Sequence, residues 1–363
     1  MEHAYTQAYA FCQQLGETPQ LVPVLYGLWR LSLVRAQLHT ARAFGNTLLG
    51  LAHPAADPAF AVIAHFALGV TWFCLGALPT ARQYLEEGIA RYTPDQHRAP
   101  VFRSGNDLGV GCQAYAAMTL WLLGYPEQAL ARLRETLALA HELSHPFSLA
   151  FAWCRAAFVL QFCRDVPAVH EQAKAAVALS TEQGFPQWVA LGTSLRGWAL
   201  AMQGQDKAGI AQVGQGIAAY RATGAALHVP YLCTMLGDVS DHLGYTEDGL
   251  QALAEAYTLM EQQEERWWEA EIYRLRGILL LRQPGTLQAE AESWLQRALD
   301  VARHQEAKSL ELRAAMSLGR LWQQQGKRVE ACQLLAPLYG WFTEGFDTAD
   351  LQEAMALLHE LGG

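Results

Sequence analysis

The stretch FPQWVALGTSLRGWALAMQGQDKAGIAQVGQGIAAYRATG, from Phe185 to Gly224, decides how this chain folds, because its pattern recurs along the sequence. Residues 188–202 are apolar on nearly every side, Gly204 interrupts them, and a second, amphipathic segment follows before Gly224 ends it. This pattern predicts two helices joined by a turn. One such pair cannot bury its own apolar faces, so it needs similar pairs on both sides.

Turns equivalent to the one at Gly204 recur mostly at intervals of 40 residues, with one interval of 48 and one of 42. They fall at Ala36, Gly76, Gly124, Arg164, Gly204, Gly244, Pro284 and Gly326. Seven residues before most of them lies a second small residue, such as Gly69 or Gly197, where a neighbouring helix can approach closely. Small side chains at such places are typical of the tetratricopeptide repeat (TPR), which usually spans about 34 residues. We therefore expect an all-α, right-handed α-solenoid of about eight TPR-like helix pairs, each repeat being roughly 40 residues long.

The whole chain, residues 1–363, is predicted to form one such solenoid. A cap helix is expected within residues 1–19, repeats over 20–344, and a C-terminal capping helix within 345–363, from Ala349 to Leu361. One irregular loop, YTPDQHRAPVFRSGND at 92–107, lengthens the interval between two turns. Insertions in repeat arrays map to loops that often carry binding.

Composition narrows the function classes. Apolar residues make up 52% of the chain and charged residues 17%, which excludes a disordered chain. The net charge is −9 and no basic run occurs, so we expect no nucleic-acid partner. The seven cysteines form no CxxC pair and lie mostly in apolar helical stretches, which favours a reducing, cytoplasmic compartment.

Two stretches of the sequence need to be tested as a secretory signal or a membrane-spanning segment. The N-terminal segment MEHAYTQAYAF lacks the basic and apolar regions of a secretory signal. The 24 residues from Pro58 to Ala81 contain no Asp, Glu, Lys or Arg and are long enough to span a bilayer. The repeat register already explains their glycines and prolines, so we expect no membrane association.

The sequence HELSH at 141–145 matches the HExxH pattern of zinc metalloproteases, which places two imidazoles on one helix face beside a general base. Pro146 follows at once and pushes the preceding His145 away from helical geometry. A polar helix end is the favoured interpretation, and a zinc-dependent hydrolase acting through His141, Glu142 and His145 stays a remote alternative. We therefore assign no catalytic residue, metal ligand or cofactor.

The concave face is the predicted binding surface, because the first helix of each stacked pair lines it. Its candidate residues are aromatic at one end and charged at the other: Phe66, Phe73, Met118, Trp121, Phe158, Trp198, Asp238, Asp241, His242 and Arg274. The irregular loop would form a rim through His97, Arg98, Arg103 and Asp107. An equally open alternative is that the aromatic side chains simply pack against neighbouring helices or the loop.

Three C-terminal segments carry a family resemblance: RWWEAEIYRLRGILLL, SLELRAAMSLGRLWQQQGKRVEACQLL and YGWFTEGFDTADLQEA. They resemble the TPR region of bacterial signalling proteins that join a class III nucleotidyl cyclase or a DNA-binding activator domain to a STAND-type ATPase. The resemblance covers essentially the whole chain and implies a region that binds something and regulates the attached domains. The chain lacks a GxxxxGKS or GxxxxGKT phosphate loop and a cyclase segment, so neither activity carries over.

These observations favour a non-catalytic regulatory scaffold that binds a peptide, helix or protein partner on its concave face. The alternative in the same class is a sensor of a small apolar effector. The oligomeric state is left open.

Overall fold

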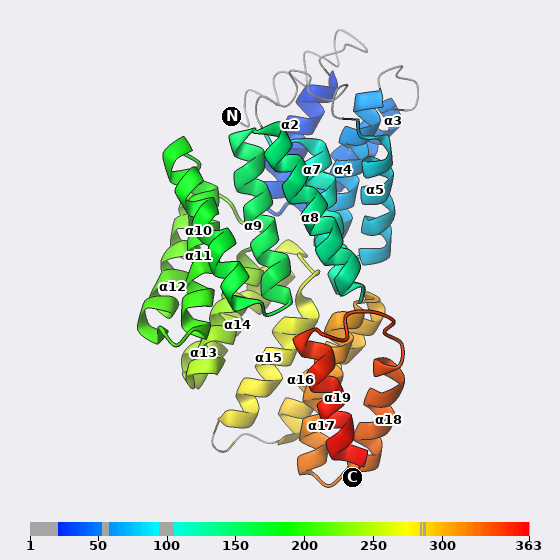
Figure 1. Cartoon of the computed structure of the whole chain (residues 1–363), viewed down its shortest axis with the longest axis vertical. Coiled ribbons are helices and arrows are strands. Elements are labelled where there is room, and N and C mark those ends of the chain that lie inside the picture. The colour runs from blue at the N-terminus through cyan, green and yellow to red at the C-terminus, as the bar shows by residue number, and fades with distance from the viewer. Residues whose placement is uncertain (1–20, 53–57, 94–104, 284, 286–287, 363) are drawn as a thin grey trace.

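The computed structural model describes residues 21–52, 58–93, 105–283, 285 and 288–362, and every regular element within them is an α-helix. The helices are α2 (Leu21–Val34), α3 (Leu38–Ala52), α4 (Pro58–Cys74), α5 (Leu78–Arg91), α7 (Leu108–Leu122), α8 (Pro126–Leu143), α9 (Pro146–Phe162), α10 (Val166–Gln183), α11 (Pro186–Met202), α12 (Asp206–Ala222), α13 (Val229–Leu243), α14 (Thr246–Gln263), α15 (Glu269–Arg282), α16 (Gln288–His304), α17 (Lys308–Gln324), α18 (Arg328–Tyr339) and α19 (Ala349–Gly362). They form antiparallel pairs followed by α19 (Figure 1), so the predicted all-α solenoid of TPR-like pairs is confirmed. The expected N-terminal cap helix lies outside the described residues.

The predicted turn positions adopt the left-handed backbone conformation that ends a helix. Gly204 has a φ of 82°, and even Arg164 has a φ of 60° because its place in the repeat requires it. In the seventh repeat Gly285 has a positive φ of 82°, and the predicted turn position, Pro284, lies outside the described residues. A proline ring holds φ near −65°, so the adjacent glycine takes this role.

The small residues that lie seven residues before the turns allow a close approach of the neighbouring helix, as their spacing predicts. A Cβ added to Gly197 on α11 would lie 2.7 Å from the main-chain nitrogen of Val213 on α12. At the equivalent Gly69 it would lie 2.7 Å from the side chain of Leu85. The paired helices therefore approach more closely than a larger side chain would allow.

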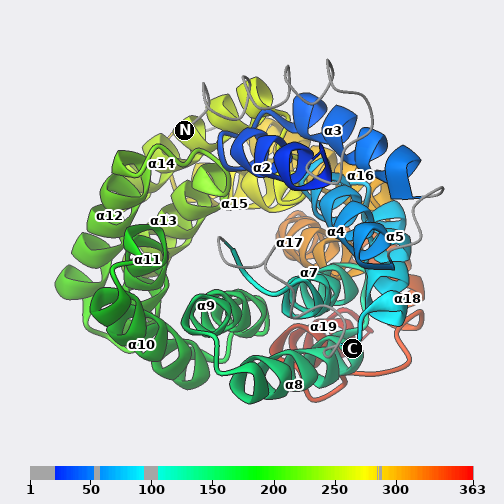
Figure 2. The same ribbon diagram turned by 90° about the horizontal axis from the view of Figure 1, so that it is seen from above.

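The first and second helices of the pairs form two layers. Figure 2 shows α9, α11 and α13 on the inside of the curve and α10, α12 and α14 on the outside. The inner helices are buried on nearly all sides, and α7 is buried from Leu108 to Leu122 except at Gln113. The outer helices bury one stripe, as α8 does at Ala129, Leu133 and Ala140.

The solenoid turns so sharply that its C-terminal repeats lie beneath its N-terminal repeats (Figures 1 and 2). This contact between later and N-terminal repeats provides hydrogen bonds to the C-terminal ends of the inner helices of the N-terminal repeats. The last carbonyl groups of those helices have no partner within the helix. The main-chain N–H of Ala226 donates to the carbonyl of Val34 at 2.8 Å, and that of Arg266 to the carbonyl of Cys74 at 2.8 Å. The Ser309 hydroxyl donates to the carbonyl of Trp121, 188 residues away, at 2.5 Å.

In the part of the chain that the structure describes, no helix combines the length and the apolar character that a membrane crossing requires.

Candidate functional site

The aromatic end of the predicted inner wall is enclosed by the protein itself. Side-chain exposure is 3% or less at each of Phe66, Phe73, Met118, Trp121, Phe158 and Trp198. The Phe73 ring lies 5.0 Å from that of Trp267, and the Phe158 ring stacks on Tyr231 at 4.5 Å. Both covering residues belong to the C-terminal half of the chain, so most of this wall packs against the protein's own later repeats and not against open solvent.

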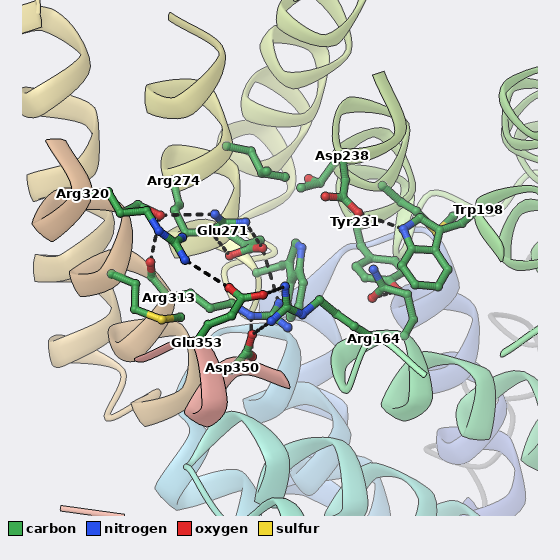
Figure 3. A pocket seen from close by; sticks show the side chains of 17 residues that line it. Arg164, Trp198, Tyr231, Asp238, Glu271, Arg274, Arg313, Arg320, Asp350 and Glu353 are labelled. Carbon is green, nitrogen blue, oxygen red and sulfur yellow. Dashed lines mark hydrogen bonds and ion pairs between the residues drawn. The ribbon is translucent and has the colours of Figure 1, made fainter. Parts of the chain in front are cut away.

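The charged end of the wall remains open. A pocket of about 140 Å³ lies between the inner helices α11, α13, α15 and α17, the end of α9 and the cap helix α19 (Figure 3). We call it the charged pocket. Its principal residues are Arg164, Trp198, Tyr231, Asp238, Glu271, Arg274, Arg313, Arg320, Asp350 and Glu353. Three of them, Trp198, Asp238 and Arg274, are predicted binding residues, and the structure brings these three together.

Glu271 is the centre of the buried part of this pocket. The Arg274 guanidinium donates to both of its carboxylate oxygens, at 2.8 and 2.7 Å, so the pairing that their spacing on α15 suggests is present. Arg313 also donates to Glu271, at 3.4 Å. Burial by itself would raise the pKa of Glu271, but Arg274 and Arg313 together hold that pKa below its usual value.

Arg313 connects this centre to both superhelical turns. Its Nη2 donates to the carbonyl of Phe162 at the end of α9, at 2.5 Å, and its Nε donates to Asp350 on α19 at 2.8 Å. Burial by itself would lower the pKa of Arg313, but the carboxylates of Asp350 and Glu271 raise it well above its usual value. The guanidinium is therefore a fixed positive charge.

The outer part of the charged pocket is an ion-pair chain at the solvent boundary. Arg164 contacts Asp350 at 2.9 Å and Glu353 at 2.8 Å, and Arg320 contacts Glu353 at 3.3 Å. The side chains of Arg164, Glu353 and Arg320 are 36%, 40% and 49% exposed. Ion pairs this accessible contribute little stability and exchange partners readily.

Asp238 differs from the other carboxylates of this pocket. It accepts a hydrogen bond from the Trp198 indole at 2.8 Å, and within the described ranges it forms no ion pair. Burial raises the pKa of its carboxyl, and the Trp198 hydrogen bond only partly offsets that effect. A cationic group that enters the pocket could contact this carboxyl group without displacing an ion pair.

The remaining predicted site residues lie elsewhere. Asp241 faces Arg282 at 3.2 Å, His242 is exposed at the end of α13, and neither lines the charged pocket. Asp107 caps α7 by accepting the Val110 N–H at 3.0 Å, which gives it a structural role. The rim residues His97, Arg98 and Arg103 lie outside the described residues.

The HExxH pattern does not form the geometry of a zinc site. Helix α8 ends at Leu143, and Ser144 has a positive φ of 49°. His145 begins the next helix and its Nδ1 lies 2.9 Å from the Ser148 hydroxyl, while His141 packs on Trp153 at 5.8 Å. The two imidazoles therefore do not share a helix face, and no three potential ligands gather around a metal position in the described part of the chain.

Several residues of the charged pocket were not among the predicted ones, namely Arg164, Glu271, Arg313, Arg320, Asp350 and Glu353. One signal in the sequence marks Arg313: it is a charged residue within SLELRAAMSLG, where Glu311 is the one other charged residue. Such a residue must meet a partner inside the protein. No spacing rule places Asp350 or Glu353 beside it, because α19 lies outside the repeat.

No family model matches this chain. A curated protein of Rhizobium meliloti (strain 1021), itself uncharacterised, is 27% identical over 316 residues, which cover 85% of this chain and 30% of that protein. The chain thus spans less than a third of that relative's length.

Solved structures share the fold at low sequence identity. A Rap protein complexed with competence and sporulation factor has a TM-score of 0.60 at 11% identity, covering 94% of this chain and 98% of the Rap chain. NprR in complex with its cognate peptide NprX has a TM-score of 0.60 at 10% identity, covering 95% of this chain and 98% of NprR. These likenesses show that the fold is a TPR-like helical solenoid.

Proposed function

We propose that this chain is a non-catalytic regulatory scaffold that binds a peptide, or a segment of a partner protein, in the charged pocket on its inner wall. The observation that carries the proposal is the chain of polar contacts that surrounds an open pocket and joins both superhelical turns. It runs from Arg164 at the end of α9 to Asp350 and Glu353 on α19 (Figure 3).

A peptide offers the chemistry that this pocket accepts. Its main-chain carbonyl groups can accept from guanidinium N–H groups, and its amide N–H groups can donate to carboxylates. Arg164, Arg320 and Glu353 are exposed enough to exchange their present partners for such groups. Asp238 adds a site for a cationic side chain or an N-terminal amine.

Ligand binding in the charged pocket would also change the contacts between two groups of helices, which gives a mechanism for regulation. Its walls come from α9, α11 and α13 on one side and from α15, α17 and α19 on the other. A ligand that replaces the Arg164 contacts to α19 therefore changes how these two groups of helices are held together. A ligand shifts such an equilibrium only through contacts that differ between the two arrangements, and these ion pairs supply that difference.

The comparisons support a peptide as the ligand class, because the similar folds were solved with a bound factor or a cognate peptide. The chain matches less than a third of its longer relative. This agrees with a role as the sensing part of a larger signalling ATPase or cyclase protein in the bacterial cytoplasm. We propose no binding of this chain to nucleic acids or to membranes.

Peptide display on the purified chain, followed by calorimetry on the selected peptides, tests the proposal. Replacing Arg164 with Met removes a guanidinium that is proposed to bind the main-chain carbonyl groups of the peptide, and we expect the Kd of a selected peptide to rise about tenfold or more. The matched control is Arg221→Met, because Arg221 forms a similarly exposed ion pair with Glu255 on the outer helices at 2.7 Å. Equal loss of affinity in both variants, or in neither, would contradict binding at the charged pocket.

A further inference from the structure

A second pocket lies higher on the inner wall, between the N-terminal helices and the start of α13. Its volume is about 60 Å³, and seven of the sixteen described lining residues are Phe, Tyr or Trp. We call it the arginine pocket; its principal residues are Trp29, Phe66, Tyr115, Phe151, Arg155 and Trp188. The charged pocket and the arginine pocket share no lining residue.

Arg155 is the unusual member of this pocket. Its side chain is only 4% exposed, and four rings cover it, with the guanidinium carbon 4.9 Å from the centre of the Tyr115 ring and 5.1 Å from that of Phe158. Its Nε and Nη1 atoms are buried and have no hydrogen-bond partner. Ring faces attract the positive charge but do not accept N–H hydrogen bonds in the guanidinium plane.

No carboxylate among the described lining residues compensates this charge. A buried acid beside the lining residue His228, Glu265, is occupied by other donors: the His228 main-chain N–H lies 2.9 Å from one of its oxygens, and the Trp267 indole 2.8 Å from the other. His228 itself lines the pocket, and burial and the Arg155 charge lower its pKa, so it stays neutral. A buried guanidinium without an acceptor is costly, and an anion supplied from outside would remove that cost.

The volume and the lining of the arginine pocket limit which anions it can bind. A cavity of about 150 Å³ holds benzene, so a space this small accepts a carboxylate group with a short apolar stem. A carboxylate is planar and carries one charge, which matches one guanidinium. A phosphate dianion would bring a second charge into the pocket, and Arg30, the other arginine in its described lining, already has a partner.

We infer that the arginine pocket binds the carboxylate group of a short-chain acid or of a peptide C-terminus, with Arg155 as the anion ligand and the aromatic rings as the wall for the apolar stem. This site is separate from the one in the proposed function, and either can fail without the other. A bound carboxylate would lie between α2, α4, α7, α9 and the start of α13, where the two superhelical turns meet.

Calorimetry on the full chain tests the inference with named probes. Butyrate represents a free acid, butyramide is its neutral match, and acetyl-alanyl-valine is compared with its C-terminal amide. We expect each acid to bind at least tenfold more tightly than its amide. The acid that binds more tightly shows whether the pocket accepts a free short-chain acid or a peptide C-terminus. Equal binding of acid and amide in both pairs, or tighter Arg155-dependent binding of inorganic phosphate, would overturn the assignment.

Substitution and spectroscopy locate the binding. Arg155→Met should abolish acid binding, and the control Arg221→Met should leave it unchanged. Because Arg155→Met removes a buried residue, a second measurement uses the unaltered chain: butyrate should shift the Arg155 Nε–H resonance in nuclear magnetic resonance spectra, and butyramide should not. An unmoved Arg155 resonance at saturating butyrate refutes the site whatever the variant does.

Discussion

The charged pocket and the arginine pocket lie on the same inner wall but handle charge in opposite ways. Four arginines and four carboxylates line the charged pocket, and most of them pair with one another. The arginine pocket holds Arg155 among aromatic rings, with no acceptor for two of its nitrogens. In the first pocket a ligand must replace bonds that the protein already makes. In the second it would provide bonds that the protein lacks.

The largest expected effect comes from breaking the buried centre of the charged pocket. Arg313→Met removes one of the two arginine partners of Glu271 and of Asp350, and it frees the Phe162 carbonyl. Removing one member of a buried ion-pair network costs about 3–5 kcal/mol of the free energy of unfolding. Urea denaturation measures this loss, and Arg320→Met, at the exposed edge, should cost less than about 1 kcal/mol. Similar losses in both variants would show that burial does not separate these two arginines.

Acid should lower the free energy of unfolding of the chain through titratable groups of the two pockets over different pH ranges. The folded pKa of His228 lies below its ordinary 6.5, so only the unfolded chain takes up that proton at first, and stability is lost as the pH falls below about 6.5. Burial lowers the pKa of His65 to about 4, which adds loss over the same range. The folded pKa of Glu271 lies below its ordinary 4.5, so its contribution is lost only below about 4.5.

Each histidine should contribute a slope of at most about 1.4 kcal/mol per pH unit in the upper range. Urea unfolding at a series of pH values measures it. The double variant His228→Gln and His65→Gln should flatten the curve between pH 6.5 and 5 and leave the loss below 4.5 in place. A curve whose upper part is unchanged in that variant would contradict the assignment.

Arg155→Met should change stability much less than Arg313→Met, although Arg155 is the more enclosed of the two. The substitution removes an uncompensated buried charge, which favours folding, and it removes the ring contacts, which opposes folding. We expect the net change to stay within about 1 kcal/mol of zero in chemical denaturation. A loss as large as that of Arg313→Met would mean that the protein already satisfies Arg155.

Asp238→Asn should have the smallest effect. The amide oxygen still accepts from Trp198, and the substitution removes a carboxylate whose ionised form is disfavoured by burial. At pH 7 we expect the free energy of unfolding to rise by a few tenths of a kcal/mol or to stay the same. Because Asp238 is the proposed contact for a cationic group, the same variant should bind a selected cationic peptide more weakly. Unchanged peptide affinity would remove Asp238 from the binding site.

The sequence predicts the helical repeat, but it does not predict that the later repeats curve back beneath the first ones. Turns at Gly204 or Arg164 follow from local chemistry, because a helix of fixed length must end at a residue that tolerates positive φ. The same spacing placed small residues such as Gly197 correctly at the helix contacts. Superhelical curvature, by contrast, is a sum of small rotations over many repeats, and no local pattern shows that Trp267 would cover Phe73.

The candidate site was predictable only in part for the same reason. Trp198 and Asp238 occupy the same inner position of successive repeats, and Arg274 lies about one helical turn before that position in the next repeat, so the register brought the three together. Asp350 and Glu353 come from a helix outside the repeat and reach the site only through the packing of α19. Arg155 could have been singled out as the one charged residue of an apolar inner helix, whereas Arg313 shares its helix with other charged residues. The sequence alone does not show how different the surroundings of these two arginines are.

The hydrogen bonds that join the superhelical turns, such as Arg266 to Cys74 and Ser309 to Trp121, also change how the molecule comes apart. In an open repeat array each unit meets only its neighbours, so the ends fray and units can be removed one at a time. Here the loss of the last repeats would uncover the aromatic wall of the first ones and unpair the ends of their helices. The chain is therefore expected to melt as one unit, and binding at one end would be felt at the other.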